Sequence, residues 1–194
     1  MSVIRRIAFF VFPRLTLLDF VGAYDALRRV AALGIDPSVT HRVIGTEATI
    51  TDDTGVRLIA DGVYEDLAPF DLLVVAGGLG TRELVRDRRV VEYLAGWGGE
   101  RPIASVCSGS LLLGAAGHLQ GRPATTHHLV LEELRPFCSE VVTGRRIVDA
   151  GRVVTAAGVT SAIDLGLYLV ERFWGAPARQ RVARQMEYPG VPAA

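Results

Sequence analysis

The stretch IASVCSGSLLLGAAG, residues 103–117, joins two apolar runs through Cys107, Ser108 and Gly109. The first run has the length of a buried strand, and the second has the content of a helix. A side chain on a sharp turn from a strand into a helix is presented to a cleft, as in a nucleophile elbow. In parallel sheets that cleft lies beyond the carboxyl ends of the strands, where such folds bind their ligands. The sequence therefore presents Cys107 as a candidate nucleophile.

Short apolar runs alternate with amphipathic ones along the chain. This alternation predicts an α/β fold in which helices cover both faces of a mainly parallel sheet. The chain has the size of one domain, which we expect to span residues 1–194. Expected strands are 4–12, 40–45, 71–76 and 102–106, with hairpins around 51–55 and 146–154; expected helices are 22–33, a region reaching Trp97, 109–116, 161–174 and 177–188. Ser161 and Asp164 have the spacing of a capping box.

Charge and composition exclude several classes of function. The chain is 49% hydrophobic and 22% charged, and its 21 basic and 21 acidic side chains cancel. This balance gives no electrostatic argument for a nucleic acid or an anionic membrane as partner. All the basic side chains are arginines, so a lysine Schiff base and a P-loop lysine are excluded.

The two cysteines, Cys107 and Cys138, form neither a disulfide framework nor a zinc motif. His41 and His118 lie in unrelated segments without ligand spacing, so no metal site is expected. No apolar segment approaches the roughly 20 residues that span a bilayer. We therefore expect a cytoplasmic protein that binds neither membrane nor metal.

The position of Cys107 has two interpretations. The positive end of a following helix lowers the pKa of a nearby thiol, which favours the reactive thiolate. Alternatively, a free cysteine is most often a small buried hydrophobic residue. Cys138 lacks such a setting and is expected to be structural or exposed.

Two other strand ends lead to the same cleft. Gly77 and Gly78 follow the apolar run 71–76, and their backbone N–H groups can approach a ligand and stabilise negative charge. A plain tight turn is the alternative. Asp19 follows the first strand, either as a general acid or base beside the thiol or as an ordinary helix-capping carboxylate.

His127 and His128 are adjacent. On an extended segment, neighbouring side chains point to opposite faces, so we expect at most one of them, His127, at the site.

The chain resembles the ThiJ/PfpI superfamily, whose fold is a flavodoxin-like three-layer sandwich of the class I glutamine amidotransferase type. The segments SVCSGSLLLGAAGHLQGRPATTHH (105–128) and LLDFVGAYDAL (17–27) look most like the isocyanide hydratase branch. GVTSAIDLGLYLVERFWG (158–175) and QMEYP (185–189) are similar too. The resemblance covers nearly the whole chain.

The resemblance implies that Cys107 is the nucleophile, Asp19 the catalytic acid or base, and Gly78 part of an oxyanion-like pocket. It implies a homodimer that needs no cofactor and hydrates a small isocyanide to a formamide. Ser108 stands where the branch commonly has threonine, and its backbone N–H is expected to bind substrate or stabilise negative charge together with Gly78. Protease-like members have histidine at this place, which argues against a peptidase. His128 replaces an aromatic residue of the branch.

Two other functions are consistent with the same residues. A cofactor-independent glyoxalase or deglycase would use the thiol against a 2-oxoaldehyde. A ligand- or redox-sensing module would use it without turnover; similar domains are fused to helix-turn-helix regulators, but the neutral charge does not favour DNA binding.

Overall fold

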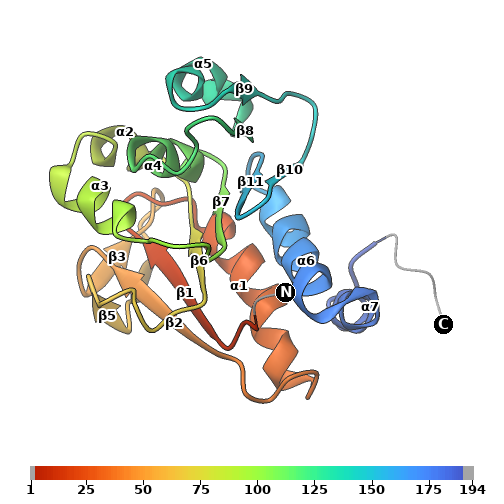
Figure 1. Ribbon diagram of the computed structural model, residues 1–194. Coiled ribbons are helices and arrows are strands. Elements are labelled where there is room, and N and C mark those ends of the chain that lie inside the picture. Colours follow the sequence, from red (N-terminus) through yellow and green to blue (C-terminus); the bar gives the residue numbers. More distant parts are fainter. Residues whose placement is uncertain (1–2, 190–194) are drawn as a thin grey trace.

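The computed structural model describes residues 3–189 and contains a central sheet of seven strands (Figure 1). The strand order is β10-β11-β7-β6-β1-β2-β5. All neighbours pair in parallel except β10 and β11. The strands are β1 (Arg6–Val11), β2 (Thr40–Gly45), β5 (Gly62–Val63), β6 (Leu72–Val75), β7 (Ile103–Val106), β10 (Ile147–Ala150) and β11 (Val153–Ala156). The predicted α/β class with a mainly parallel sheet is confirmed.

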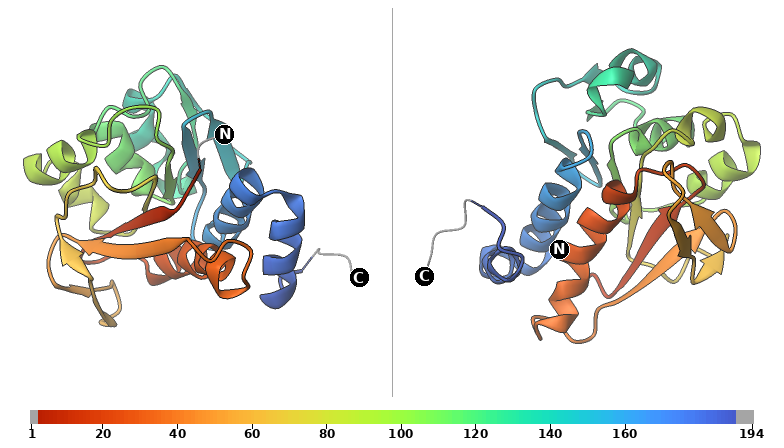
Figure 2. Two further views of the ribbon diagram at one scale, coloured as in Figure 1. Left: turned by 60° about the horizontal axis from the view of Figure 1, so that its bottom comes forward. Right: turned by 180° about the vertical axis from the view of Figure 1, so that it is seen from behind.

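Helices cover both faces of the sheet, as the alternating pattern predicted (Figures 1 and 2). One face carries α1 (Leu17–Ala32), α6 (Ser161–Trp174) and α7 (Ala176–Gln185), which contact one another. The other face carries α2 (Thr81–Leu84), α3 (Arg88–Ala95) and α4 (Gly109–Ala115). The sheet is therefore the middle of three layers.

Strands β6, β7 and β11 are buried along their whole length, which explains their continuous apolar sequences. The chain runs from β1 to β2 on one side and then returns through β6 to β7 and β11 on the other. The order therefore reverses between β1 and β6. Ligand sites of open α/β sheets lie at such a switch point, beyond the carboxyl ends of the strands.

Smaller elements lie outside the main sheet. Strands β3 (Thr49–Thr51) and β4 (Arg57–Ile59) form the hairpin that the sequence predicted around 51–55. Strands β8 (Pro123–Ala124) and β9 (Glu140–Val141) pair across an excursion that sequence reasoning missed. This excursion also holds α5 (Leu131–Leu134) and the 3₁₀ turns His128–Val130 and Arg135–Phe137.

Two local predictions were wrong. Helix α1 begins at Leu17 rather than at residue 22, so Asp19 lies in its first turn. The expected capping box at α6 does not form, because Thr160 is the N-cap and the Ser161 hydroxyl has no hydrogen-bond partner among the described residues. Asp164 instead pairs with Arg146, which removes it from the cap.

Small residues allow α1 and α6 to pack closely. A Cβ atom at Gly22 would lie 2.8 Å from the Cβ of Ala162 and 3.1 Å from the backbone nitrogen of Ile163. A Cβ at Gly166 would lie 2.7 Å from the Cβ of Ala26. This close packing fixes the position of α1, and with it the position of Asp19. Within residues 3–189, no helix is both long and apolar enough to span a membrane.

Substituting Gly22 by valine should force the two helices apart. We expect Gly22→Val to lower the free energy of unfolding by about 1–3 kcal/mol, as overpacking of a tight interface does. Gly98→Val is the matched control, because a Cβ at Gly98 meets nothing closer than 3.9 Å. Urea unfolding of both variants checks the prediction, and equal stabilities would contradict it.

Candidate active site

Cys107 lies on the sharp turn between β7 and α4, where the sequence predicted it. Its φ of 55° is in the left-handed region, which a non-glycine residue adopts at a cost of about 1–3 kcal/mol. Hydrogen bonds hold the turn: its N–H donates to the carbonyls of Ala156 and Ala157 at 3.0 and 3.1 Å. Its carbonyl accepts from the hydroxyls of Ser110 at 3.1 Å and Thr126 at 3.0 Å. These four hydrogen bonds hold the backbone of Cys107 in its strained conformation.

The buried carboxyl of Asp19 lies beside Cys107. The Asp19 side chain is fully buried, and among the described residues its carboxyl has no hydrogen bond of ordinary geometry; the Cys107 thiol and the Gly77 N–H are the polar groups that act on it as donors. A Cβ at Gly77 would lie 2.8 Å from both Asp19 Oδ2 and Cys107 Cβ. Gly77 therefore leaves the space in which the carboxyl and the cysteine side chain approach each other. Asp19 is not a helix cap, since the N-cap of α1 is Thr16.

The environment of Asp19 favours a protonated carboxyl. Burial raises its pKa from 3.8 to about 7. The Cys107 thiol and the Gly77 N–H offset part of this rise, and the negative charge of Asp53 adds to it. A carboxyl with a pKa near neutrality is suited to both accepting and donating a proton.

The thiol is less acidic than the sequence suggested. Burial and the neighbouring Asp19 carboxylate raise the pKa of Cys107 to about 12. The backbone N–H groups of Ser108 and Val159 offset this only in part by hydrogen bonding to the sulfur. The expectation that the helix terminus lowers the pKa was therefore wrong: α4 is only seven residues long, and desolvation is the larger effect. The thiol therefore holds its proton at neutral pH, and a reaction that uses the thiolate would need a group to accept that proton.

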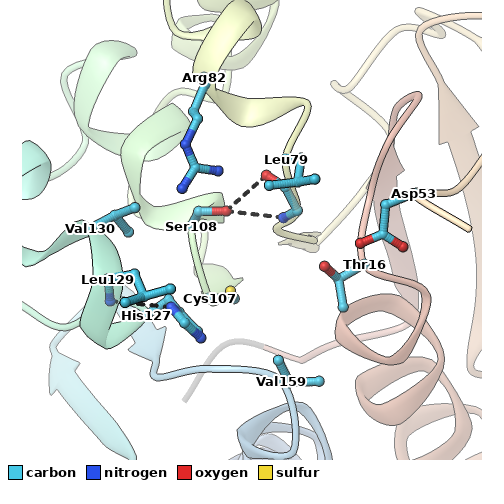
Figure 3. A pocket seen from close by; sticks show the side chains of 11 residues that line it. Thr16, Asp53, Leu79, Arg82, Cys107, Ser108, His127, Leu129, Val130 and Val159 are labelled. Carbon is cyan, nitrogen blue, oxygen red and sulfur yellow. Dashed lines mark hydrogen bonds between the residues drawn. The ribbon is translucent and has the colours of Figure 1, made fainter.

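The Ser108 hydroxyl connects the elbow to the loop after β6. Its Oγ accepts from the Gly78 N–H and donates to the Gly78 carbonyl, both at 3.0 Å (Figure 3). The Ser108 hydroxyl makes no hydrogen bond to Asp19 or to the Cys107 sulfur, because Gly78 is its partner both as donor and as acceptor. The Gly78 N–H is likewise engaged, and the N–H groups that hydrogen-bond to the sulfur are those of Ser108 and Val159.

His127 lines the pocket beside Cys107, whereas His128 is exposed. The prediction that these side chains point to opposite faces was wrong: their rings stack at 4.3 Å between centroids. The reason is that the chain turns at His127, whose Nδ1 accepts from the Leu129 N–H at 3.2 Å. Burial lowers the pKa of His127, and the positive charges of His128 and Arg82 lower it further.

A pocket of about 200 Å³ opens beside the thiol (Figure 3). Of the predicted site residues, Gly78, Cys107, Ser108 and His127 line it; Asp19 and Gly77 are next to Cys107 but are not part of the lining. Sequence reasoning missed seven other lining residues: Thr16, Asp53, Leu79, Arg82, Leu129, Val130 and Val159. The pocket is small, and most of its lining is apolar, so it suits a small molecule.

Val159 follows the carboxyl end of β11, so the rule that identified Cys107 and Gly77 also applies to it. Its φ of 33° is unusual for a β-branched residue. This conformation accompanies the approach of its N–H to the Cys107 sulfur.

Among the residues described, no group of three or more histidine, cysteine, aspartate or glutamate side chains is arranged to hold a metal ion. Cys138 is half-buried, with its sulfur 3.6 Å from the Leu134 carbonyl.

Comparison with known proteins assigns the family. Residues 5–172 match the DJ-1/PfpI family. The chain belongs to the DJ-1/PfpI family. It is 34% identical over 188 residues to isonitrile hydratase from Pseudomonas putida, covering 96% of this chain and 80% of that protein. A crystal structure of a ThiJ/PfpI family protein from Pseudomonas syringae matches with a TM-score of 0.84 and 28% identity, covering 100% of this chain and 78% of that one.

Other relatives in the family have different names and lengths. Deglycase PH1704 from Pyrococcus horikoshii is 29% identical over 123 residues, covering 62% of this chain and 70% of the relative. Protein DJ-1 homolog A from Arabidopsis thaliana is 29% identical over 163 residues, covering 81% of this chain but only 40% of the relative. The family therefore includes named enzymes, and the expected superfamily is confirmed.

Removing the Ser108 hydroxyl should destabilise the loop after β6. Ser108→Ala leaves the buried Gly78 N–H without its acceptor, which should lower the free energy of unfolding by about 1–3 kcal/mol. Ser108→Thr keeps a hydroxyl and should lose less. Urea unfolding measures both, with Ser139→Ala at an exposed serine as the control. A loss no larger than that of the control would contradict this role.

Ionising Asp19 should destabilise the fold. Because the folded-state pKa is about 7 and the ordinary value is 3.8, the folded protein binds the proton more tightly. Its contribution to stability is therefore fully present at low pH and is lost as pH rises from about 4 to about 7. Relative to Asp19→Asn, the wild-type free energy of unfolding should fall by roughly 2–4 kcal/mol across this range. Parallel pH dependences of urea unfolding for the two proteins would refute this.

Proposed function

We propose that the protein hydrates a small isocyanide to an N-substituted formamide, with Cys107 as nucleophile and Asp19 as proton carrier. One observation supports this most strongly: a buried carboxyl with a pKa of about 7 lies against a thiol beside a small pocket. Isocyanide hydration needs one nucleophile and one proton delivered to the same carbon, and this pair supplies both.

In the first step the Cys107 sulfur bonds to the terminal carbon of R–N≡C. The Asp19 carboxylate takes the thiol proton as the S–C bond forms, and then gives that proton to the same carbon. The product is a thioimidate, R–N=CH–S–Cys107, which contains every atom of the thiol and the isocyanide. This route suits a thiol whose pKa is raised, because the proton moves to an adjacent base rather than to solvent.

In the second step water adds to the thioimidate carbon. One water proton goes to the imine nitrogen, giving R–NH–CH(OH)–S–Cys107. The C–S bond then breaks as the carbonyl forms, and Asp19 transfers the hydroxyl proton to the departing sulfur. The products are R–NH–CHO and the free thiol, so the cycle closes without a cofactor.

Two backbone donors support these steps. The N–H groups of Ser108 and Val159 stabilise negative charge on the Cys107 sulfur, both before attack and when the C–S bond breaks. Their positions are set by the strained turns at Cys107 and Val159. Similarity to isonitrile hydratase over 96% of the chain adds independent support for the reaction.

A second candidate is hydration or release of a 2-oxoaldehyde, as in a cofactor-independent glyoxalase or deglycase. The similarity to a protein named deglycase favours it, and the same thiol would add to the aldehyde carbon. Purified protein should be offered an aryl isocyanide and methylglyoxal in separate ultraviolet assays, with formamide identified by mass spectrometry. Formamide production supports the hydratase; turnover of methylglyoxal alone selects the alternative, and turnover of neither favours a sensing module.

The acid–base role of Asp19 predicts a specific pattern of activity. Asp19→Asn should fold but lose about 10²–10⁴-fold in isocyanide turnover, because an amide cannot carry the proton. Asp19→Glu keeps the carboxyl but moves it by one methylene, so it should lie between Asn and wild type.

Matched cysteine variants complete the test. Cys107→Ala should abolish formamide production, whereas Cys138→Ala should leave it unchanged, since Cys138 lies outside the pocket lining. Thermal unfolding of each variant confirms that it is folded. Near wild-type hydration by a folded Asp19→Asn variant would overturn the mechanism.

A further inference from the structure

Arg82 is a charged residue of the pocket that neither the sequence motifs nor the proposed mechanism uses. It lies on α2 and lines the pocket beside Cys107. Within the described part of the chain, its side chain makes no hydrogen bond or ion pair. The adjacent carboxylate, Glu83, is already paired with Arg14 at 2.6 Å. The guanidinium of Arg82 is therefore left available to a ligand.

Figure 3 shows the side chain of Arg82 extending from α2 into the pocket, toward Ser108. Its positive charge reaches His127, whose pKa it helps to lower. Asp53 and Thr16 lie across the pocket from Arg82. The pocket thus has a cation on one side and a carboxylate on the other, and the Cys107 thiol also lines it.

We propose that Arg82 binds a carboxylate carried by the substrate, so that the preferred substrates are small isocyanides with an anionic tail. The isocyanide part of this inference rests on the proposed hydratase function. The preference for a negatively charged ligand does not depend on it. A guanidinium binds a carboxylate through two parallel N–H bonds, which fixes orientation as well as affinity.

The rest of the pocket limits where the anionic end can lie. Asp53 repels an anion from the opposite side of the pocket. Leu79, Leu129 and Val130 offer apolar contacts next to Arg82. A volume of about 200 Å³ leaves room for only a short spacer between the carboxylate and the reacting carbon.

Alkylation of Cys107 tests the charge preference without requiring turnover. Iodoacetate and iodoacetamide differ mainly in charge, and peptide mass mapping measures the rate for each at Cys107. Arg82→Gln should lower the ratio of the iodoacetate rate to the iodoacetamide rate by about three- to tenfold, as expected for an exposed charge that lines the pocket. Arg82→Lys should restore part of this ratio.

The control is Arg86→Gln, which removes an exposed arginine near α2 that does not line the pocket. It should leave the ratio unchanged, and salt at about 1 M should suppress the wild-type preference by screening. The proposal is overturned if Arg82→Gln and Arg86→Gln give the same ratio as wild type.

Turnover assays then separate this proposal from the proposed function. Isocyanoacetate and its methyl ester carry the same isocyanide but differ in charge. Wild type should favour the acid, and Arg82→Gln should raise KM for the acid about three- to tenfold while leaving that for the ester unchanged. If neither compound is hydrated, the hydratase proposal fails, and the alkylation ratio alone still decides the role of Arg82. Equal KM changes for acid and ester would overturn that role.

Discussion

The close approach of a buried carboxyl and a buried thiol is the constraint on which this structure depends. Asp19 comes from the helix after β1, and Cys107 from the turn after β7, with β6 between those strands. The two side chains can meet only because Gly77, at the end of β6, has no side chain of its own. The strand order, the reversal between β1 and β6, and the close packing of α1 on α6 all serve to hold this contact.

The contact between Asp19 and Cys107 lowers the stability of the fold in two ways. The backbone at Cys107 is strained, and the carboxyl of Asp19 is buried, so that ionising it in the folded protein is costly. Each such feature costs on the order of 1–3 kcal/mol. The fully buried strands on either side of the elbow offset these costs through apolar burial, while the hydrogen bonds from the Cys107 backbone keep the turn from relaxing.

The sequence predicted the parts of the site that follow from strand topology. Residues after strand ends, such as Cys107, Gly77 and Asp19, meet at one edge of a parallel sheet, and an apolar run marks each strand. Arg82 and Asp53 could not be found this way, because their places depend on how a short helix and a hairpin fold over that edge. The stacking of His127 on His128 was missed for a similar reason: the turn at His127 breaks the extended geometry that the prediction assumed.

The raised pKa of the thiol changes how the site should be understood. A cysteine that is permanently ionised is a better nucleophile, but it brings no proton to the reaction. The first step of the proposed isocyanide hydration adds both sulfur and hydrogen to one carbon, so that mechanism needs the proton to stay close during attack. Burial keeps that proton on the Asp19–Cys107 pair, since desolvation raises the pKa of both groups. The backbone N–H groups of Ser108 and Val159 then favour the thiolate only while the carboxyl holds the proton. The same burial that destabilises the ionised pair in the folded state would therefore couple the proposed nucleophile to its proposed acid.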